Sequence, residues 1–325
     1  MEQTDPIDID RPRWDQSSYL GRVKHFFSVT DPLTVFASNA KLDRSKATVE
    51  AVRRNDPSVA SLSRSEIWEA KKLYASAFHP ETGEKLLLFG RMSFQVPGNM
   101  VLMGCMLTFY RSLPAVAFWQ IANQTFNATV NYTNRNASAP TSFETLGKSY
   151  LMACGGAVAT AMGMNKLIAL SPSLQAGVMG RWASGFMALA AANYINISMM
   201  RSAESENGIV VHSRNGEDLG NSQIAAKSAI RQVIFSRICM AVPATLIPAI
   251  IMNKLEKKPF LLARPALRSP IMVALVGINL AMSTPLCCAL FPQESSLEIS
   301  SLETSIQEKA KSMNITGSAY FNKGL

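Results

Sequence analysis

An asparagine-rich run at residues 123–136 holds the densest set of side chains that could recognise a small polar solute. Its first four asparagines, from Asn123 to Asn134, recur at intervals of three or four residues, so a helix continuing through the run would carry them on one face. Amides both donate and accept hydrogen bonds, which suits the carboxylate and the ammonium of a zwitterion. The alternative is a structural amide ladder between neighbouring helices. The candidate side chains are Asn123, Gln124, Asn127, Asn131, Asn134 and Arg135.

A single arginine, Arg111, interrupts an apolar segment three residues before Pro114. An arginine at the centre of a bilayer costs about 2.5–3.5 kcal/mol on insertion scales, so we expect Arg111 to face a helix bundle or a wet cavity and to bind a carboxylate. Pro114 would free a backbone carbonyl nearby, and transporters use such carbonyls as ligands. The alternative is that Arg111 reaches the membrane surface or pairs with a helix C-terminus.

An imidazole and two carboxylates come together just before the first apolar segment, in the run His79, Pro80, Glu81, Thr82, Gly83 and Glu84. This combination could form an acid/base or gating cluster. A helix stop at the proline followed by a tight turn at the glycine explains the same residues without chemistry, and we favour that interpretation.

Two later asparagines, Asn193 and Asn196, close a segment that has a small residue at every fourth position from 176 to 192. Small residues at this spacing allow close helix packing in a bilayer, so the stripe itself is predicted to be structural. The two amides join the candidate substrate site. Further breaks in apolar segments, which flank transport sites in some carriers and also occur in inert bundles, fall at Pro243, Pro248, Asn279 and Pro285.

Five apolar segments must position these residues, at about 98–122, 147–170, 176–200, 232–252 and 270–291. Each has roughly the 20 residues that cross a bilayer core, and none contains an Asp or Glu. The sequence predicts an all-α fold: a polar helical head at 1–97, a five-span transmembrane domain at 98–291, and an amphipathic tail at 292–325. Within the head, Ser63 and Glu66 form a capping box.

The composition agrees with a membrane protein. Of the 325 residues, 48% are hydrophobic and 17% charged, which excludes a disordered chain. The net charge is +9, and many of the excess basic residues lie at 231–270, beside an apolar segment. They form a short stripe and not a basic face, so we expect no nucleic-acid partner. The positive-inside rule then places the head and the connection 253–269 on one side, with the C-terminus opposite. The acid-rich N-terminus does not read as a signal peptide.

The sequence lacks the residues that several classes of function require. The five cysteines form no CxxC pair and the three histidines are widely separated, so we expect no metal site and no cofactor. No nucleophile elbow, phosphate-binding loop or dinucleotide fingerprint is present, which argues against an enzyme. Proton relays need a carboxylate within the membrane, so a uniporter or an exchanger is the simpler hypothesis.

Several stretches from near the start to the last residue give the sequence a strong resemblance to the sideroflexins, also called the tricarboxylate carrier family. They are Pro12-Arg-Trp-Asp-Gln16, Gly21-Arg-Val-Lys-His25, the run 79–84, the run 123–136, Cys288-Ala-Leu-Phe-Pro-Gln293 and Tyr320-Phe-Asn-Lys-Gly-Leu325. The family often has Asp where this chain has Glu81. Phe109-Tyr-Arg-Ser-Leu-Pro-Ala-Val116 and Arg91-Met-Ser-Phe-Gln95 look most like the sideroflexin 2 branch.

The resemblance implies a five-span protein of the mitochondrial inner membrane, with its N-terminus in the matrix and its C-terminus in the intermembrane space. It also implies serine transport that supports one-carbon metabolism and, indirectly, iron and haem homeostasis. We therefore expect a carrier of a small neutral amino acid, serine first, whose partners are that solute and the membrane lipid. The alternative is a non-transporting membrane scaffold that recruits iron-handling or haem-synthesis proteins.

Overall fold

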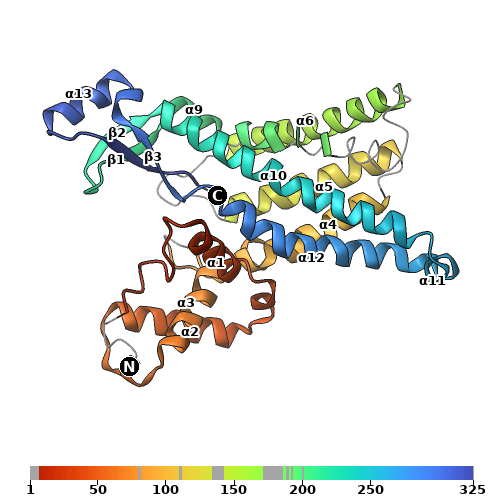
Figure 1. The fold of residues 1–325 in the computed structure, drawn as a ribbon, viewed down its shortest axis with the longest axis horizontal. Helices are drawn as coiled ribbons and strands as arrows, with labels where there is room; N and C mark the ends of the chain where they lie inside the picture. The colour runs from red at the N-terminus through yellow and green to blue at the C-terminus, as the bar shows by residue number, and fades with distance from the viewer. Residues whose placement is uncertain are drawn as a thin grey trace.

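The structure is a computed structural model that describes residues 7–79, 82–109, 112–133, 143–170, 186–187, 190–191, 193–199 and 201–324. Helices make up most of the described chain, as the sequence predicts. Figure 1 shows three parts: a helical head near the N-terminus, a bundle of long helices, and a small sheet with its own helices. The sequence did not predict the sheet.

The head is built on helices α1 (Tyr19–Val29), α2 (Asn39–Arg53) and α3 (Arg64–Ala77), with short 3-10 turns η1 (Pro32–Phe36) and η2 (Pro57–Ser61) between them. A serine caps each α-helix. The predicted capping box is confirmed, because Ser63 Oγ accepts from Glu66 N at 3.3 Å and Glu66 Oε2 accepts from Ser63 N at 2.8 Å. Leu42 and Val49 pack against Leu73 in a buried core.

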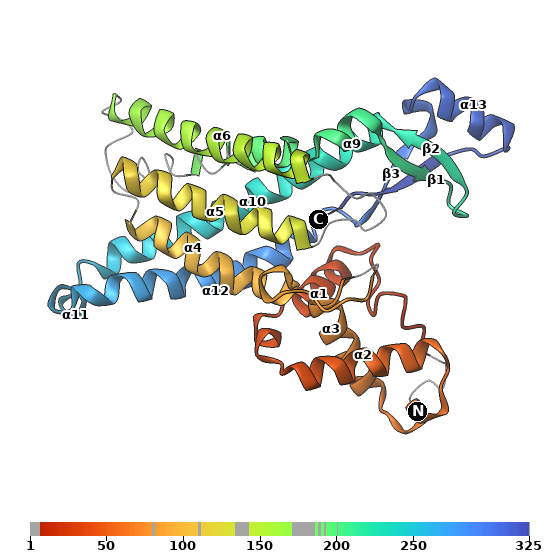
Figure 2. The same cartoon turned by 180° about the vertical axis from the view of Figure 1, so that it is seen from behind.

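The long helices form a bundle that begins after the turns η3 (Leu88–Gly90) and η4 (Met92–Phe94). Its members are α4 (Gln95–Phe109), α5 (Leu113–Thr133), α6 (Phe143–Ala169), helical residues 193–199, α10 (Gln223–Leu255), the short α11 (Pro259–Ala263), the turn η5 (Pro265–Leu267) and α12 (Arg268–Cys288). Figure 2 shows α4, α5 and α6 side by side on the face away from the viewer of Figure 1. Helices α10 and α12 run together and turn back at α11 (Figure 1).

Glycines set how closely α4 and α12 approach. A Cβ at Gly104 would lie 2.6 Å from Val273 Cγ2 and 2.8 Å from Val273 Cα, and one at Gly277 would lie 2.1 Å from Met100 Sδ. Because the partner number falls on α12 as it rises on α4, the two helices are antiparallel. Val96, Ala244, Val276 and Leu280 fill the contact between α4, α10 and α12.

The first predicted span, 98–122, is not one helix. Helix α4 ends at Phe109, Ser112 is a bend, and α5 begins at Leu113. The two helices form an antiparallel hairpin in which Phe94 packs near Phe126 and Phe109 stacks on Trp119. Pro114 is the second residue of α5, a position where proline removes no helical hydrogen bond. The carbonyl that Pro114 was expected to free belongs to residue 110, which lies outside the described residues, so that expectation stays a prediction.

Two helices within the described chain are long and apolar enough to cross a bilayer, Gln223–Leu255 and Pro265–Cys288. They match the fourth and fifth predicted spans. A shorter apolar stretch covers Tyr150–Gly163, inside the second predicted span. The structure thus supports membrane-spanning helices, and the number five stays a prediction.

A four-stranded antiparallel sheet joins two distant parts of the chain. Its strands are β1 (Ile209–His212), β2 (Asp218–Ser222), β3 (Glu294–Glu298) and β4 (Ser318–Asn322), in the order β2-β1-β4-β3. Helices α9 (Ser202–Asn207) and α13 (Thr304–Ser312) and the turn η6 (Ile299–Ser301) complete this unit. Phe321, Leu219 and Ile306 belong to its core. Within the predicted amphipathic tail at 292–325, strand β3 and the turn η6 precede Thr304, the helix α13 occupies only 304–312, and strand β4 follows.

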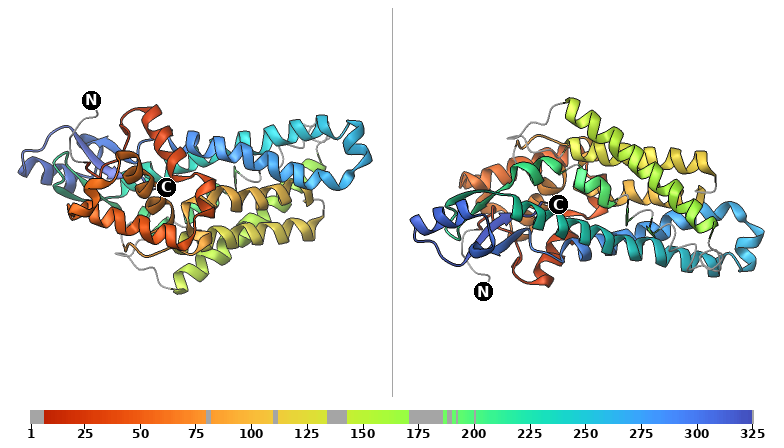
Figure 3. Two further views of the ribbon diagram at one scale, coloured as in Figure 1. Left: turned by 90° about the horizontal axis from the view of Figure 1, so that it is seen from below. Right: turned by 90° about the horizontal axis from the view of Figure 1, so that it is seen from above.

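The head and the sheet lie at the same end of the bundle, and α11 lies at the other (Figures 1 and 3). Tyr19 Oη donates to the carbonyl of Leu286 at 3.0 Å and Arg22 Nε donates to that of Ala289 at 2.8 Å, so α1 packs on the C-terminal end of α12. The sequence predicted the head beside the connection 253–269. That prediction differs from the structure because the α4–α5 hairpin adds a reversal of the chain.

Candidate functional site

Helix α5 carries the asparagine run, as the sequence predicts, as far as Thr133. Asn123 and Asn127 are half-buried on it, while Asn131 lies in the helix without a described side chain. Asn134 and Arg135 fall outside the described residues, as do Arg111, Pro80 and Glu81. The predicted asparagine face is therefore partly placed, and its two described members are not its most buried amides.

The buried amide of this region is Gln124, which is only 3% exposed. Its Oε1 accepts a hydrogen bond from Asn196 Nδ2 at 2.6 Å, which joins α5 to the helical residues 193–199. Asn193 is half-buried one turn before Asn196. The sequence named these three candidates, and the structure brings Gln124 and Asn196 into contact. It also buries Gln120, at 2% exposure, one turn before Gln124 on the same face.

Replacing Gln124 with leucine should destabilise this contact, because the amide of Asn196 would lose a partner in a part-buried place. An unsatisfied buried amide costs about 1–3 kcal/mol, so we expect a clear fall in the unfolding temperature in detergent. Asn123→Leu is the matched control on the neighbouring, half-buried position. Equal unfolding temperatures for both variants would show that the Gln124–Asn196 bond does not stabilise the bundle.

The run His79 to Glu84 forms a tight turn. The backbone N–H of His79 donates to the carbonyl of Glu84 at 2.8 Å, and that of Gly83 donates to the carbonyl of His79 at 2.9 Å. Gly83 has a φ of 64°, which glycine adopts without strain. Lys46 Nζ holds the turn by donating to the carbonyl of Gly83 at 2.7 Å, and the side chain of Glu84 is exposed. This geometry supports the structural interpretation of the motif.

A second polar group lies between α4, α10 and α12. The hydroxyls of Ser93, Ser236 and Ser283 are buried, at 1%, 8% and 5% exposure, and have no hydrogen-bond partner in the described part of the chain. The antiparallel register that sets Gly277 against Met100 brings Ser93 to the level of Ser283 two turns further on. The packing of Ala244 against Val276 and Leu280 brings Ser236 to that level as well.

Two prolines add backbone acceptors at nearly the same level. Pro243 in α10 and Pro285 in α12 cannot donate, so the carbonyls of Cys239 and Ala281 lose their helical partners. By the same register these two residues lie within about two helical turns of one another. Asn279 Oδ1 and Gln95 Nε2 are further buried atoms that lack a hydrogen-bond partner among the described residues. We call this set, Ser93, Gln95, Ser236, Asn279, Ser283 and the two carbonyls, the serine layer.

The serine layer is uncharged and can both donate and accept. Hydroxyls and the Gln95 amide can donate to a carboxylate, and the freed carbonyls can accept from an ammonium. Helices α4, α5, α10 and α12 contain no Asp or Glu. Sequence reasoning noted Pro243, Asn279 and Pro285 as breaks and missed the three serines, whose signal is visible only once the helix register is known. The described residues also contain no group of three or more His, Cys, Asp or Glu side chains that could hold a metal.

The fold and these sites define a class, a helical membrane protein with buried uncharged polar groups. The family model of the sideroflexins matches residues 8–325. Sideroflexin-1 of Ovis aries is 51% identical over 322 residues, and Sideroflexin-1 of Homo sapiens is 51% identical over 321. Sideroflexin-3 of Homo sapiens is 50% identical over 320 residues, and all three alignments cover 98% of both chains. No solved structure matches.

This chain therefore belongs to the sideroflexin family, as its motifs indicated. The relatives named here carry the numbers 1 and 3, so the likeness to the second branch stays a prediction. Membership in the family and the two membrane-length helices together indicate a membrane protein.

Proposed function

We propose that this sideroflexin is a carrier, not an enzyme, that moves a small neutral amino acid across the mitochondrial inner membrane. Serine is the main candidate for that solute. The observation that carries the proposal is the serine layer, because it combines three buried hydroxyls that have no protein partner in the described chain with two freed carbonyls. Groups of this kind, buried in apolar helices, are costly unless a ligand or water satisfies them.

The chemistry of the layer fits a neutral zwitterion. A net positive charge on the solute would need a compensating carboxylate, and the helices around the layer contain no Asp or Glu. Helix α10 does carry Arg231 and Arg237, so this argument excludes a net cation only. The Gln124–Asn196 amides lie on a separate contact and would line or support the path. Transport of serine would feed one-carbon metabolism, with any effect on iron and haem indirect.

The experiment is uptake of labelled serine by proteoliposomes that contain the purified chain. We expect saturable uptake that is inhibited by unlabelled serine and by other small neutral amino acids. Citrate should not inhibit it. Empty liposomes are the control. Uptake no faster than in empty liposomes, by protein that is correctly folded, would contradict the proposal and favour the alternative of a membrane scaffold that recruits partners through its head.

A further inference from the structure

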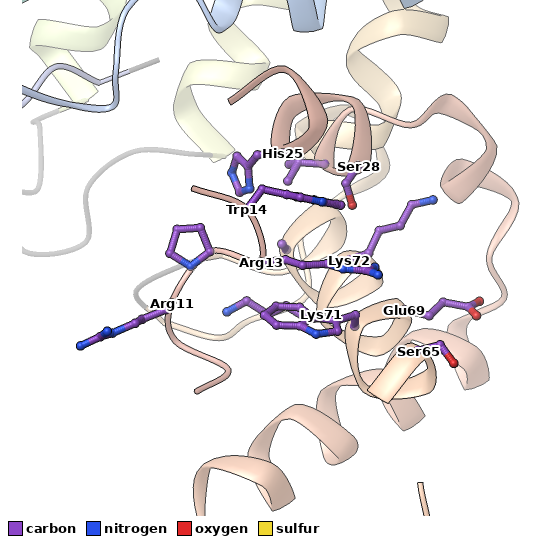
Figure 4. A pocket seen from close by; sticks show the side chains of 13 residues that line it. Arg11, Arg13, Trp14, His25, Ser28, Ser65, Glu69, Lys71 and Lys72 are labelled. Atoms are coloured by element: carbon purple, nitrogen blue, oxygen red, sulfur yellow. The ribbon is translucent and has the colours of Figure 1, made fainter. Parts of the chain in front are cut away.

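A hollow of about 190 Å³ opens in the head between α1, α3 and the segment 11–14. Figure 4 shows His25 and Ser28 of α1 on one side of it, and Ser65, Glu69, Lys71 and Lys72 of α3 on the other. Trp14 and Trp68 also line it. The hollow is far in sequence from the serine layer, and no part of the transport proposal uses it.

The hollow carries an excess of positive charge. Some of its charged groups form ion pairs within the head: Arg11 with Asp8, Glu69 with Lys41, and Lys72 with Asp31. Arg13, His25 and Lys71 have no carboxylate within salt-bridge distance in the described part of the chain. Three basic side chains therefore face one hollow without forming an ion pair among the described residues.

His25 and Lys71 are half-buried beside the hollow, while Arg13 is exposed. Burial lowers the pKa of His25, and the positive charge of Lys71 lowers it further. Burial likewise lowers the pKa of Lys71, and the nearby Arg53 adds to the effect, while Asp10 and Asp8 oppose it. An anion between these groups would favour their charged forms.

Two indole rings lie beside the guanidinium of Arg13. Its guanidinium carbon lies 5.2 Å from the ring centre of Trp14 and 5.9 Å from that of Trp68, within the range of cation–π contacts. A guanidinium held in this way presents its donor fork in one orientation. Such a fork matches the oxygens of a phosphate group, and a lysine adds a point charge.

The same helix that lines the hollow also carries exposed apolar side chains. Leu20 and Phe27 of α1 are 68% and 36% exposed, and α1 packs on the end of the membrane-length helix α12 through Tyr19. A helix with an exposed apolar face beside such a helix can lie at a bilayer surface. Phosphate in solution and phosphate in a lipid headgroup can therefore both reach the hollow.

We propose that the hollow formed by Arg13, Trp14, His25, Trp68 and Lys71 binds a phosphate group. The ligand is either a soluble phosphate or the headgroup of an anionic phospholipid, and the proposal does not depend on which solute the bundle carries.

The test uses the full chain and the fluorescence of its tryptophans, two of which line the hollow. In detergent micelles the probe is inorganic phosphate. In nanodiscs the protein is compared in phosphatidylcholine alone and with added phosphatidic acid. We expect a saturable change in at least one arm, and the arm that responds identifies the source of the phosphate. No saturable change in either arm would overturn the proposal.

The variant Arg13→Gln/Lys71→Gln should weaken the response about tenfold or more, because it removes two charged donors. The control Arg44→Gln/Arg54→Gln removes the same charge from exposed positions of α2 and its C-terminal cap. Lys71→Gln alone leaves the Arg13 contacts in place and guards against misfolding of the double variant, and it should also weaken binding. Equal weakening by the pocket and control variants would overturn the proposal, since it would show general surface charge.

Discussion

A Ser283→Ala variant should fold at least as stably as the wild-type chain and take up serine on the order of tenfold more slowly. The Ser283 hydroxyl is buried without a partner in the described chain, so removing it removes a desolvated group and need not destabilise the bundle. If the hydroxyl binds the solute, its loss costs about 1.5–3 kcal/mol of a hydrogen bond to a charged group. The two measurements are thermal unfolding in detergent and uptake in proteoliposomes.

The control for Ser283→Ala is Thr108→Val in α4. The Thr108 hydroxyl donates to the carbonyl of Gly104 at 2.7 Å inside its own helix, so its removal should leave uptake near the wild-type rate. A Ser283→Ala protein that transports serine at the wild-type rate would remove the serine layer from the transport path. Loss of uptake together with loss of stability would instead indicate a packing role.

The largest structural effect should come from Gly104→Val. A Cβ at this position would meet the backbone of Val273 at 2.8 Å, and backbone cannot move aside as the end of a side chain can. Helices α4 and α12 would have to separate, at a cost of about 1–3 kcal/mol or more for overpacking. We expect a fall of several degrees in the unfolding temperature in detergent and a low yield of folded protein.

Gly155→Val in α6 is the matched control, because a Cβ there meets no atom within 4 Å. Its unfolding temperature should stay close to that of the wild type, apart from the small helix preference of valine. If Gly104→Val were as stable as this control, the close contact of α4 with α12 would not determine the stability of the bundle.

The features that local chemistry decides could be predicted from the sequence. The capping box of Ser63 and Glu66 depends on four consecutive residues, and the turn at Gly83 depends on a proline and a glycine nearby. The fourth and fifth apolar segments are long enough that their length alone predicts membrane-length helices. Gln124 and Asn196 were candidates because buried amides need partners, although their pairing needs the fold.

The features that distant contacts decide could not be predicted. Strand β4 pairs with β1 through Tyr320 and His212, more than one hundred residues apart. Ile299, Leu302 and Ile306 follow helical spacing, yet they come from a 3-10 turn, a cap and a helix that share one core. The hairpin at 98–122 was not predicted because apolar residues continue on both sides of the short polar interruption at 111–112, and this gives the length of a single span.

Both ends of the chain meet at one end of the bundle, where Arg201 donates to the carbonyl of Lys323 at 2.9 Å and α1 contacts Ala289. For a membrane-embedded bundle, an enzyme tag on either terminus would report the same compartment, and one protease added to that side would reach the head and the sheet. Of the residues that the structure describes, the opposite end of the bundle carries the α11 turn with its neighbouring lysines and arginines. Among the described residues, the two ends of this protein would therefore be chemically unequal: one offers the folded surface of the head and the sheet, and the other offers a basic turn.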